Sequence, residues 1–293
     1  MKTLRYAITG ANGNIGVFLV KYLRQHGHVV YELVRSPEKA MDVNYYKYFD
    51  LANSSHILTL HGIDILIHAA YFMDTRSIKY KDINIIGSTM LFQQASIDSV
   101  KYVVFISTVS AYSTARSLYG NTKYQLEQLL INSNCNAVVV RPGLVLHKSL
   151  HGIAATIDNF VKKSLIIPLI GNGSQLIYPC FLEDLARCIL TLSMQQLKIK
   201  KPIIAAAEQA LTFRQLVQYL AKHNHKQRIF IPIPFSVIYL LLKSIEFFKL
   251  PIGLRSDSLL GMHYGNKSID FSETRNLGIN FNKLIHPKVD ICG

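Results

Sequence analysis

Two side chains four residues apart, Tyr119 and Lys123 in the segment YGNTK, could together transfer a proton. In a helix, the i, i+4 spacing places both side chains on one face. A lysine ammonium close to a phenol stabilises the phenolate and lowers the pKa of the tyrosine. A tyrosine tuned in this way can give a proton to, or take one from, a carbinol oxygen while hydride moves between the carbon and a nicotinamide. Because the chain has 16 tyrosines, this spacing alone arises easily by chance and needs support from its surroundings.

A run of hydroxyl side chains precedes this pair. The segment STVSAY begins at Ser107, where the apolar run 102–107 predicts that a strand ends. Hydroxyls at the carboxyl end of a central strand point into the crevice where such sheets bind ligands. One of them can hold a substrate oxygen and orient it toward Tyr119. Ser110 on its own would more often be an ordinary turn residue.

A glycine-rich segment near the start of the chain, TGANGNIG at 9–16, predicts a phosphate site. It follows an apolar run and opens a helical pattern, so free N–H groups and a partial positive charge point at the turn. Gly10 allows the tight turn, Gly13 lets the backbone approach a pyrophosphate, and Gly16 lets the helix pack against the strand. The alternative is a glycine turn without a ligand. The residues predicted to contact the cofactor here are Gly10, Asn12, Gly13, Asn14, Ile15 and Gly16.

The end of the second predicted strand selects the cofactor. An acidic residue there binds the ribose hydroxyls of NAD, whereas an arginine accommodates the additional phosphate of NADP. Arg35 stands at that strand end, and Glu32 lies too far inside the strand for this role. NADP(H) is therefore favoured over NAD(H). The alternative is that Arg35 is only a surface cation.

The order of apolar and helical patterns predicts the fold that positions these residues. β-branched runs alternate with helical patterns in the first half, which favours an α/β fold with a doubly wound parallel sheet and right-handed crossovers. The predicted strands are 4–8, 29–34, 45–49, 64–68, 102–107 and 137–141, and the predicted helices between them are 15–23, 78–96 and 119–131.

The second half of the chain is less regular. Helices are predicted at 153–163 and 182–194, after Thr212 (whose capping box is completed by Gln215), and after Pro234. Ser272 is expected to cap a last helix that ends at Gly278. We predict a nucleotide-binding domain at 1–145 and a smaller, partly interleaved α/β substrate region at 146–293, with a strand at 203–206 returning to the first sheet.

Composition limits the choice of partners and compartment. The formal net charge of +14 favours an anionic partner such as a nucleotide, a nucleic acid or a membrane surface. The basic residues are scattered, so nucleic acid is disfavoured. The four cysteines have neither metal-ligand nor disulfide spacing, which predicts no metal and a reducing, cytoplasmic environment. No signal peptide or membrane span is expected, and residues 229–242 are expected to be a core strand and helix, with membrane-surface contact as the minority interpretation.

Taken in order, these segments resemble the motifs of an extended short-chain dehydrogenase/reductase, a family with a Rossmann-type fold, in its NAD-dependent epimerase/dehydratase group. The matching segments are TGANGNIG, Asp50-Leu51, His68-Ala69-Ala70, Asn84 and Gly87 in NIIGS, Arg141-Pro142-Gly143 and Glu183-Asp184-Leu185. They cover about the first two hundred residues.

The resemblance implies further cofactor contacts. Asp50 and Leu51 would contact adenine, and the backbone after the fourth strand would line the cofactor, with the side chain of His68 packing rather than catalysing. The residues assigned to the cofactor beyond the glycine turn and Arg35 are Asp50, Leu51, His68, Ala69, Ala70, Ser107, Tyr119, Lys123 and Pro142.

The resemblance also assigns catalytic roles. Thr108 would be the hydroxyl partner, since it lies four residues before Tyr112, and Ser107 is the neighbouring candidate. Tyr119 would be the acid/base, Lys123 its tuning partner and ribose anchor, and Tyr112 would shape the pocket. The interval from Thr108 to Tyr119 is short for the family, so the substrate loop must be small.

Three readings of the function follow. A dehydratase usually carries an Asp-Glu pair after the hydroxyl, where this chain has Val109 and Ser110. A reductase that uses NADPH to reduce a keto group of a nucleotide-activated sugar therefore fits best, with an NAD(P)-dependent nucleotide-sugar epimerase as the alternative. The short interval also leaves open a non-catalytic NADP-binding sensor or assembly protein. The C-terminal part loosely resembles proteins of bacterial polysaccharide synthesis, Arg255 is more an ordinary surface arginine than a phosphate ligand, and a homodimer is left open.

Overall fold

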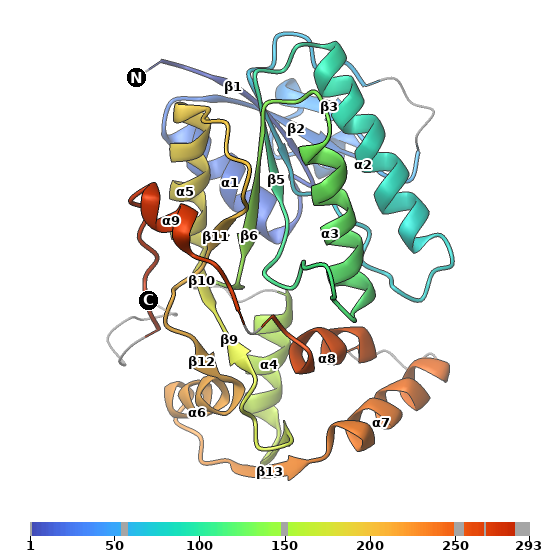
Figure 1. The fold of residues 1–293 in the computed structure, drawn as a ribbon, viewed down its shortest axis with the longest axis vertical. Helices are drawn as coiled ribbons and strands as arrows, with labels where there is room; N and C mark the ends of the chain where they lie inside the picture. Colours follow the sequence, from blue (N-terminus) through green and yellow to red (C-terminus); the bar gives the residue numbers. More distant parts are fainter. Residues whose placement is uncertain (1, 54–57, 148–151, 249–254, 267, 285–293) are drawn as a thin grey trace.

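The computed structural model describes residues 2–53, 58–147, 152–248, 255–266 and 268–284, and one large parallel sheet organises it (Figure 1). Its seven strands lie in the order β11-β6-β5-β4-β1-β2-β3, and each neighbouring pair is parallel. The bounds are β1 Arg5–Thr9, β2 Val29–Val34, β3 Tyr46–Tyr48, β4 Ile65–His68, β5 Tyr102–Ile106, β6 Ala137–Pro142 and β11 Ile203–Ala205. The order reverses between β1 and β4, which confirms the predicted doubly wound α/β fold and places its crevice at their carboxyl ends.

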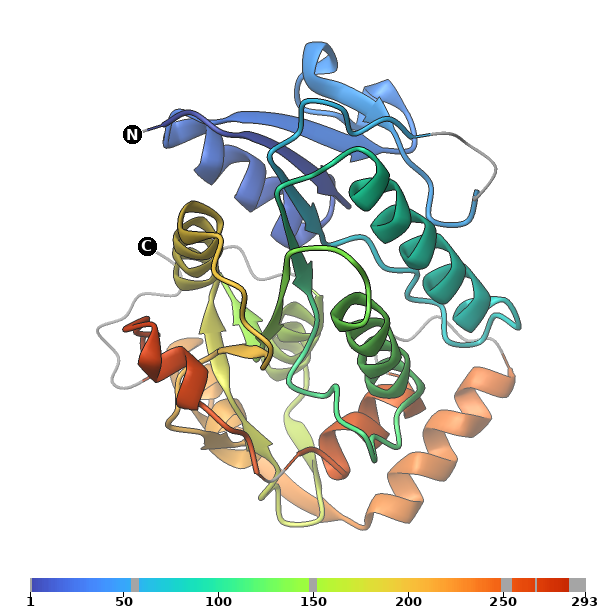
Figure 2. The ribbon, with the colours of Figure 1, turned by 45° about the horizontal axis from the view of Figure 1, so that its top comes forward.

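Helices cover both faces of this sheet (Figures 1 and 2). On one face α1 (Asn14–Gln25) packs against α5 (Leu182–Gln195), and on the other α2 (Tyr80–Ile97) packs against α3 (Leu118–Ile131). Successive side chains of a strand point to opposite faces of the sheet. Tyr6 and Ile8 therefore join the core under α1 and α5, while Ala7 joins the core under α2 and α3. Burial on both faces is the reason that the strands are continuously apolar. Two short 3₁₀ helices, η1 (Pro37–Lys39) and η2 (Val43–Tyr45), precede β3.

A second hydrophobic core lies below the carboxyl edge of the sheet in Figure 1. The elements around it are β7 (Leu144–Leu146), α4 (Gly152–Lys163), β8 (Ile166–Ile170), β9 (Leu176–Ile177), β10 (Pro179–Phe181), β12 (Leu211–Thr212), α6 (Phe213–His223), β13 (Ile229–Ile233) and α8 (Ser256–His263). Helix α7 (Phe235–Phe247) packs beside them in a smaller cluster with α8. Three two-stranded sheets join these strands, β10 with β7, β12 with β9, and β13 with β8. The predicted capping box of Thr212 and Gln215 is present at the start of α6.

Parts of the second half return to the first sheet. The strand predicted at 203–206 is present as β11 and pairs with β6. The hydroxyl of Thr274, in α9 (Ser272–Asn276), accepts from the Ile204 N–H and donates to the Ile204 carbonyl, both at 3.0 Å. The expected cap at Ser272 is wrong: α9 is preceded by Phe271, and the Ser272 N–H donates to Asp270 instead. The division of the chain at about residue 145 stays a prediction.

Among the described residues, no helix is long and apolar enough to cross a lipid bilayer.

One glycine in α2 tests how tightly this fold is packed. A Cβ at Gly87 would lie 2.2 Å from the Leu51 carbonyl oxygen, so Gly87→Ala must push the Asp50-Leu51 turn away from the helix. We expect the free energy of unfolding to fall by about 1–3 kcal/mol, the usual cost of overpacking. Urea denaturation measures it.

The matched control is Gly261→Ala in α8, whose nearest neighbour would lie at 3.4 Å, an ordinary contact. Alanine favours a helix interior by up to about 1 kcal/mol over glycine, so this variant should be as stable as the parent or more so. Equal losses in both variants would contradict the packing argument.

Candidate active site

The glycine turn has the geometry of a phosphate site. Gly10 adopts a φ of +66°, and a Cβ there would lie 2.9 Å from the backbone of Ala70. Gly13 precedes α1 without any side-chain cap, and the first turn of the helix has no acidic residue. Asn12, Gly13 and Asn14 are exposed. Uncapped N–H groups and a positive helix end on an open turn fit a pyrophosphate.

Gly16 closes the turn on itself. A Cβ at Gly16 would lie 2.1 Å from the Gly10 carbonyl oxygen and 2.7 Å from the Ala11 Cα. We expected Gly16 to bring α1 against β1. Instead, Gly16 brings α1 against the turn that precedes the helix.

A buried hydrogen-bond chain fixes the ends of β1 and β4. The Thr9 hydroxyl accepts from the N–H groups of Ala69 and Ala70 at 3.1 Å and lies 2.7 Å from His68 Nδ1. His68 Nε2 lies 2.9 Å from the Ser88 hydroxyl. Burial lowers the pKa of His68 to about 3, so the ring is neutral, and this network makes Nε2 the protonated nitrogen. The His68 side chain thus packs and positions the loop, as expected, and the two alanine N–H groups are held by Thr9.

The Asp50-Leu51 turn rests on α2. The Asp50 carboxylate accepts from the Ala52 N–H at 3.0 Å, and the carbonyl of the buried Leu51 closely approaches Gly87. Asn84 in the same helix binds the loop after β4, accepting from the Phe72 N–H at 2.9 Å and donating to the Phe72 carbonyl at 3.0 Å. The NIIGS motif therefore holds two loops at the crevice.

Arg35 and Glu32 differ in their availability to a ligand. Glu32 is fully buried, pairs with Arg24 at 3.0 Å and accepts from the N–H groups of Met41 and Asp42. Its carboxylate is occupied within the protein, which supports its exclusion as a ribose ligand. Arg35 is exposed at the end of β2, and no ion pair of its side chain is found within the described part of the chain.

Thr108 and Tyr119 are brought together despite the short interval between them. Burial raises the pKa of Tyr119 to about 12, and a side-chain hydrogen bond from Thr108 opposes that rise. The Thr108 hydroxyl also accepts from the Ser110 N–H at 3.2 Å. Tyr119 is therefore a protonated phenol at neutral pH with an oriented hydroxyl beside it.

Lys123 is buried, but it does not tune Tyr119 in the expected way. Its ammonium donates to the Ile106 carbonyl at 2.7 Å and lies over the rings of Tyr71 at 4.4 Å and Phe105 at 4.7 Å. The Tyr71 ring stands edge-on to Tyr119, with centroids 5.3 Å apart. The predicted lowering of the Tyr119 pKa by Lys123 is thus wrong for this geometry: burial raises that pKa, and the group that opposes the rise is Thr108. Burial also lowers the pKa of Lys123 itself to about 7, although Glu127 opposes that shift.

Glu127 is the main site residue that the sequence analysis missed. It is fully buried on α3. Its carboxylate accepts from Arg141 Nε at 2.8 Å and from Arg141 Nη2 at 2.5 Å. The Ser107 hydroxyl donates to the same carboxylate, so Ser107 is occupied and Thr108 is the available hydroxyl. Its position four residues after Lys123 was the signal that could have found it.

Residues from the C-terminal half cover this site. Asp257 in α8 accepts from the N–H groups of Leu118 and Tyr119 at 2.6 and 3.1 Å, which fixes the start of α3. The Tyr112 hydroxyl donates to the Tyr264 carbonyl, so Tyr112 ties the loop to α8. Arg255 donates to the Met73 carbonyl at 2.6 Å, in keeping with a structural role.

Pro142 and Gly143, at the end of β6, complete the carboxyl edge of the parallel sheet. The carbonyl of the buried Pro142 accepts from the Val109 N–H at 3.0 Å, and a Cβ at Gly143 would lie 2.0 Å from the Tyr178 carbonyl oxygen. In the EDL segment, Asp184 binds Arg187 and Asn282, so its role here is structural. No group of three or more His, Cys, Asp or Glu within the described ranges could hold a metal ion.

Known proteins share this architecture. UDP-glucose 4-epimerase of Vibrio cholerae is 24% identical over 189 residues, which cover 55% of this chain and 58% of that protein. The chain therefore matches little more than half the length of this relative. The solved UDP-glucose 4-epimerase of Thermotoga maritima with UDP-glucose superposes with a TM-score of 0.66 and 19% identity, covering 79% of this chain and 86% of that one.

The solved dTDP-4-dehydrorhamnose reductase of Bacillus anthracis in complex with NADP gives a TM-score of 0.64 and 19% identity over 81% of this chain and 86% of that one. Both structures show the fold. The sequence profile described as the NAD dependent epimerase/dehydratase family matches residues 6–206, well over half of the chain. Because this match spans the glycine turn, the strand-end hydroxyl and the helical tyrosine, the chain belongs to the NAD dependent epimerase/dehydratase family of NAD(P)-dependent enzymes.

Proposed function

We propose that this enzyme uses NADPH to reduce a keto group of a nucleotide-activated sugar. The observation that carries the proposal is the pairing of Tyr119 with Thr108 at the carboxyl end of β5. A partly buried phenol with a pKa of about 12 keeps its proton at neutral pH, which suits a group that must give a proton to a substrate oxygen. Thr108 is placed to hold that oxygen beside the phenol.

NADPH, when bound, supplies the hydride that reduces the keto carbon. The uncapped turn of Gly10, Gly13 and α1 would hold the pyrophosphate, and Lys123 would donate to the ribose. Tyr119 protonates the oxygen that becomes the alcohol. General acid catalysis of this kind contributes about 10²–10⁴-fold, and positioning in the crevice contributes much of the rest.

Arg35 supports NADP over NAD. An exposed guanidinium with no partner among the described residues is available to a phosphate, and it can bind two phosphate oxygens at once. The acid of this strand, Glu32, is occupied within the protein and is not available to a ribose.

The main alternative is a nucleotide-sugar epimerase, which the likeness to the Vibrio cholerae enzyme favours. The sensor or assembly protein loses its main support, because the short interval does not separate Thr108 from Tyr119. For location we propose the cytoplasm, since the three described cysteines are free thiols.

Removing the phenol hydroxyl tests the acid. We expect Tyr119→Phe to lower kcat for reduction of a 4-keto nucleotide sugar by about 10²–10⁴-fold while NADPH still binds. The initial rate of NADPH oxidation gives kcat, and titration of NADPH fluorescence measures its binding. The control is Tyr124→Phe on the same helix, which should retain activity; a full kcat in Tyr119→Phe would overturn the assignment.

Lys123 predicts a pH dependence of cofactor binding. Its pKa is lowered to about 7, so the ammonium is present below that pH and is lost above it. Because an ammonium is the stronger donor to ribose oxygens, the affinity for NADPH should fall as pH rises through neutrality. The 2′-phosphate also titrates, so the measured quantity is the difference from Lys123→Met, in which this fall should vanish. Parallel pH profiles in the two proteins would contradict it.

Arg35→Ala should weaken NADPH binding by roughly tenfold to a hundredfold, the usual loss of a hydrogen bond to a charged group, and leave NADH unchanged. Lys39→Ala, which removes another exposed cation nearby, controls for general electrostatics. Titration calorimetry gives all three sets of Kd. If wild type binds NADH as tightly as NADPH, Arg35 does not select the cofactor.

A further inference from the structure

The surface formed by β8, β13 and α7 lies at the end of the molecule opposite β3 in Figure 1; it carries exposed apolar side chains that no other described residue covers. We call it the basal surface. The two-stranded sheet of β8 and β13 has one covered face, where Ile167, Leu169 and Phe230 join the second core. On its other face Ile166 and Ile229 are paired in register and both are about half exposed.

Helix α7 continues this pattern. Its inner face packs on α8 through Leu242 and Ile238. Four outer side chains are 53–80% exposed, Val237, Leu240, Leu241 and Phe247. At 100° per residue they fall within an arc of about 120°, so they form one stripe rather than scattered exposure. Contiguous exposed apolar side chains of this kind mark an interaction site.

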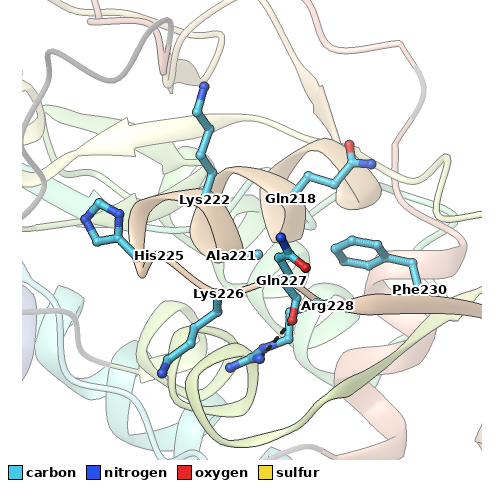
Figure 3. Close-up of a pocket in the computed structure, with 8 residues that line it drawn as sticks. All are labelled: Gln218, Ala221, Lys222, His225, Lys226, Gln227, Arg228 and Phe230. Carbon is cyan, nitrogen blue, oxygen red and sulfur yellow. Dashed lines mark hydrogen bonds between the residues drawn. The ribbon is translucent and has the colours of Figure 1, made fainter.

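Cations border the basal surface, and the one acid of α7, Glu246, is engaged within the protein, accepting from the N–H and the hydroxyl of Ser256 at 2.7 and 2.8 Å. Residues 159–182 and 209–245 contain seven Lys and Arg and no Asp or Glu. Lys222, Lys226 and His225 project around a shallow hollow at the end of α6, beside the start of β13 (Figure 3). Arg228 in the same hollow is used internally, donating to the α4 carbonyls of Val161 and Lys162 at 2.6 and 2.8 Å. The free positive charge is therefore carried by the lysines.

We propose that the basal surface binds an anionic phospholipid membrane, with the stripe of α7 entering the headgroup boundary and the lysines of the α6 end contacting lipid phosphates. An apolar helix face bordered by lysines is the composition of helices that lie in a membrane interface. The charge supports lipid over a second copy, because a symmetric contact would bring like-charged rims together. The inference does not depend on the reaction assigned to the crevice.

Vesicle sedimentation with the full chain tests the binding. Wild type should sediment with mixed phosphatidylcholine and phosphatidylglycerol vesicles, much less with phosphatidylcholine alone, and less in high salt. Replacing both Leu240→Ser and Leu241→Ser should weaken binding at least roughly tenfold, because each leucine loses apolar burial. The control, Ile78→Ser with Ile97→Ser, removes side chains elsewhere that are even more exposed than the two leucines, and it should bind as wild type. Lys222→Gln with Lys226→Gln should lose binding and salt dependence together.

A second measurement keeps the proposal falsifiable if adsorption is unspecific. The chain has no tryptophan, so Leu241→Trp provides a single reporter. Its emission should move to shorter wavelength when anionic vesicles are added, whereas Ile97→Trp should not change. An unchanged Leu241→Trp emission, or no sedimentation of wild type in low salt, overturns the proposal. So does light scattering that shows a dimer dissolved by the double serine variant without any vesicle binding, since the basal surface would then bind a second copy.

Discussion

The buried carboxylate of Glu127 is the interaction on which the site depends. A charge removed from water must be paired, and removal of one partner of a buried pair costs about 3–5 kcal/mol. Arg141 on β6 and Ser107 at the end of β5 supply the pairing, while Glu127 itself belongs to α3. The requirement to satisfy one carboxylate therefore fixes a helix against two strands. That helix carries Tyr119 and Lys123, and the end of β5 carries Thr108.

The same geometry explains why a short loop is sufficient. Thr108 follows β5 directly, and Tyr119 stands in the first turn of α3, whose start is fixed by Asp257 from α8. The two ends are held by separate elements, so the loop between them only has to connect them. The C-terminal half thus contributes to the crevice through backbone capping, in addition to any contact with substrate.

Much of the fold follows from local sequence. The strand 29–34 has the predicted bounds, and β11 joins β6, because buried parallel strands are apolar throughout and the pattern is unambiguous. The glycine motif likewise predicted the tight turn at Gly10, whereas Gly16 lies against that turn and not against the strand as expected. What the pattern did not predict are long-range contacts. Asp257 lies 139 residues from the N–H of Leu118 that it caps, and no periodicity encodes that distance. The pKa of Tyr119 was misjudged for a related reason, since burial depends on Tyr71 and the rest of the fold rather than on spacing to Lys123.

The central claim is a net reduction, and the stoichiometry of cofactor use tests it most directly. Purified protein is incubated with a limiting 4-keto nucleotide sugar and excess NADPH, and consumed NADPH is compared with alcohol product identified by mass spectrometry. The account predicts one NADPH oxidised for each product formed. An epimerised sugar without net loss of NADPH, or tight binding of NADPH with no product from a panel of keto nucleotide sugars, would contradict it.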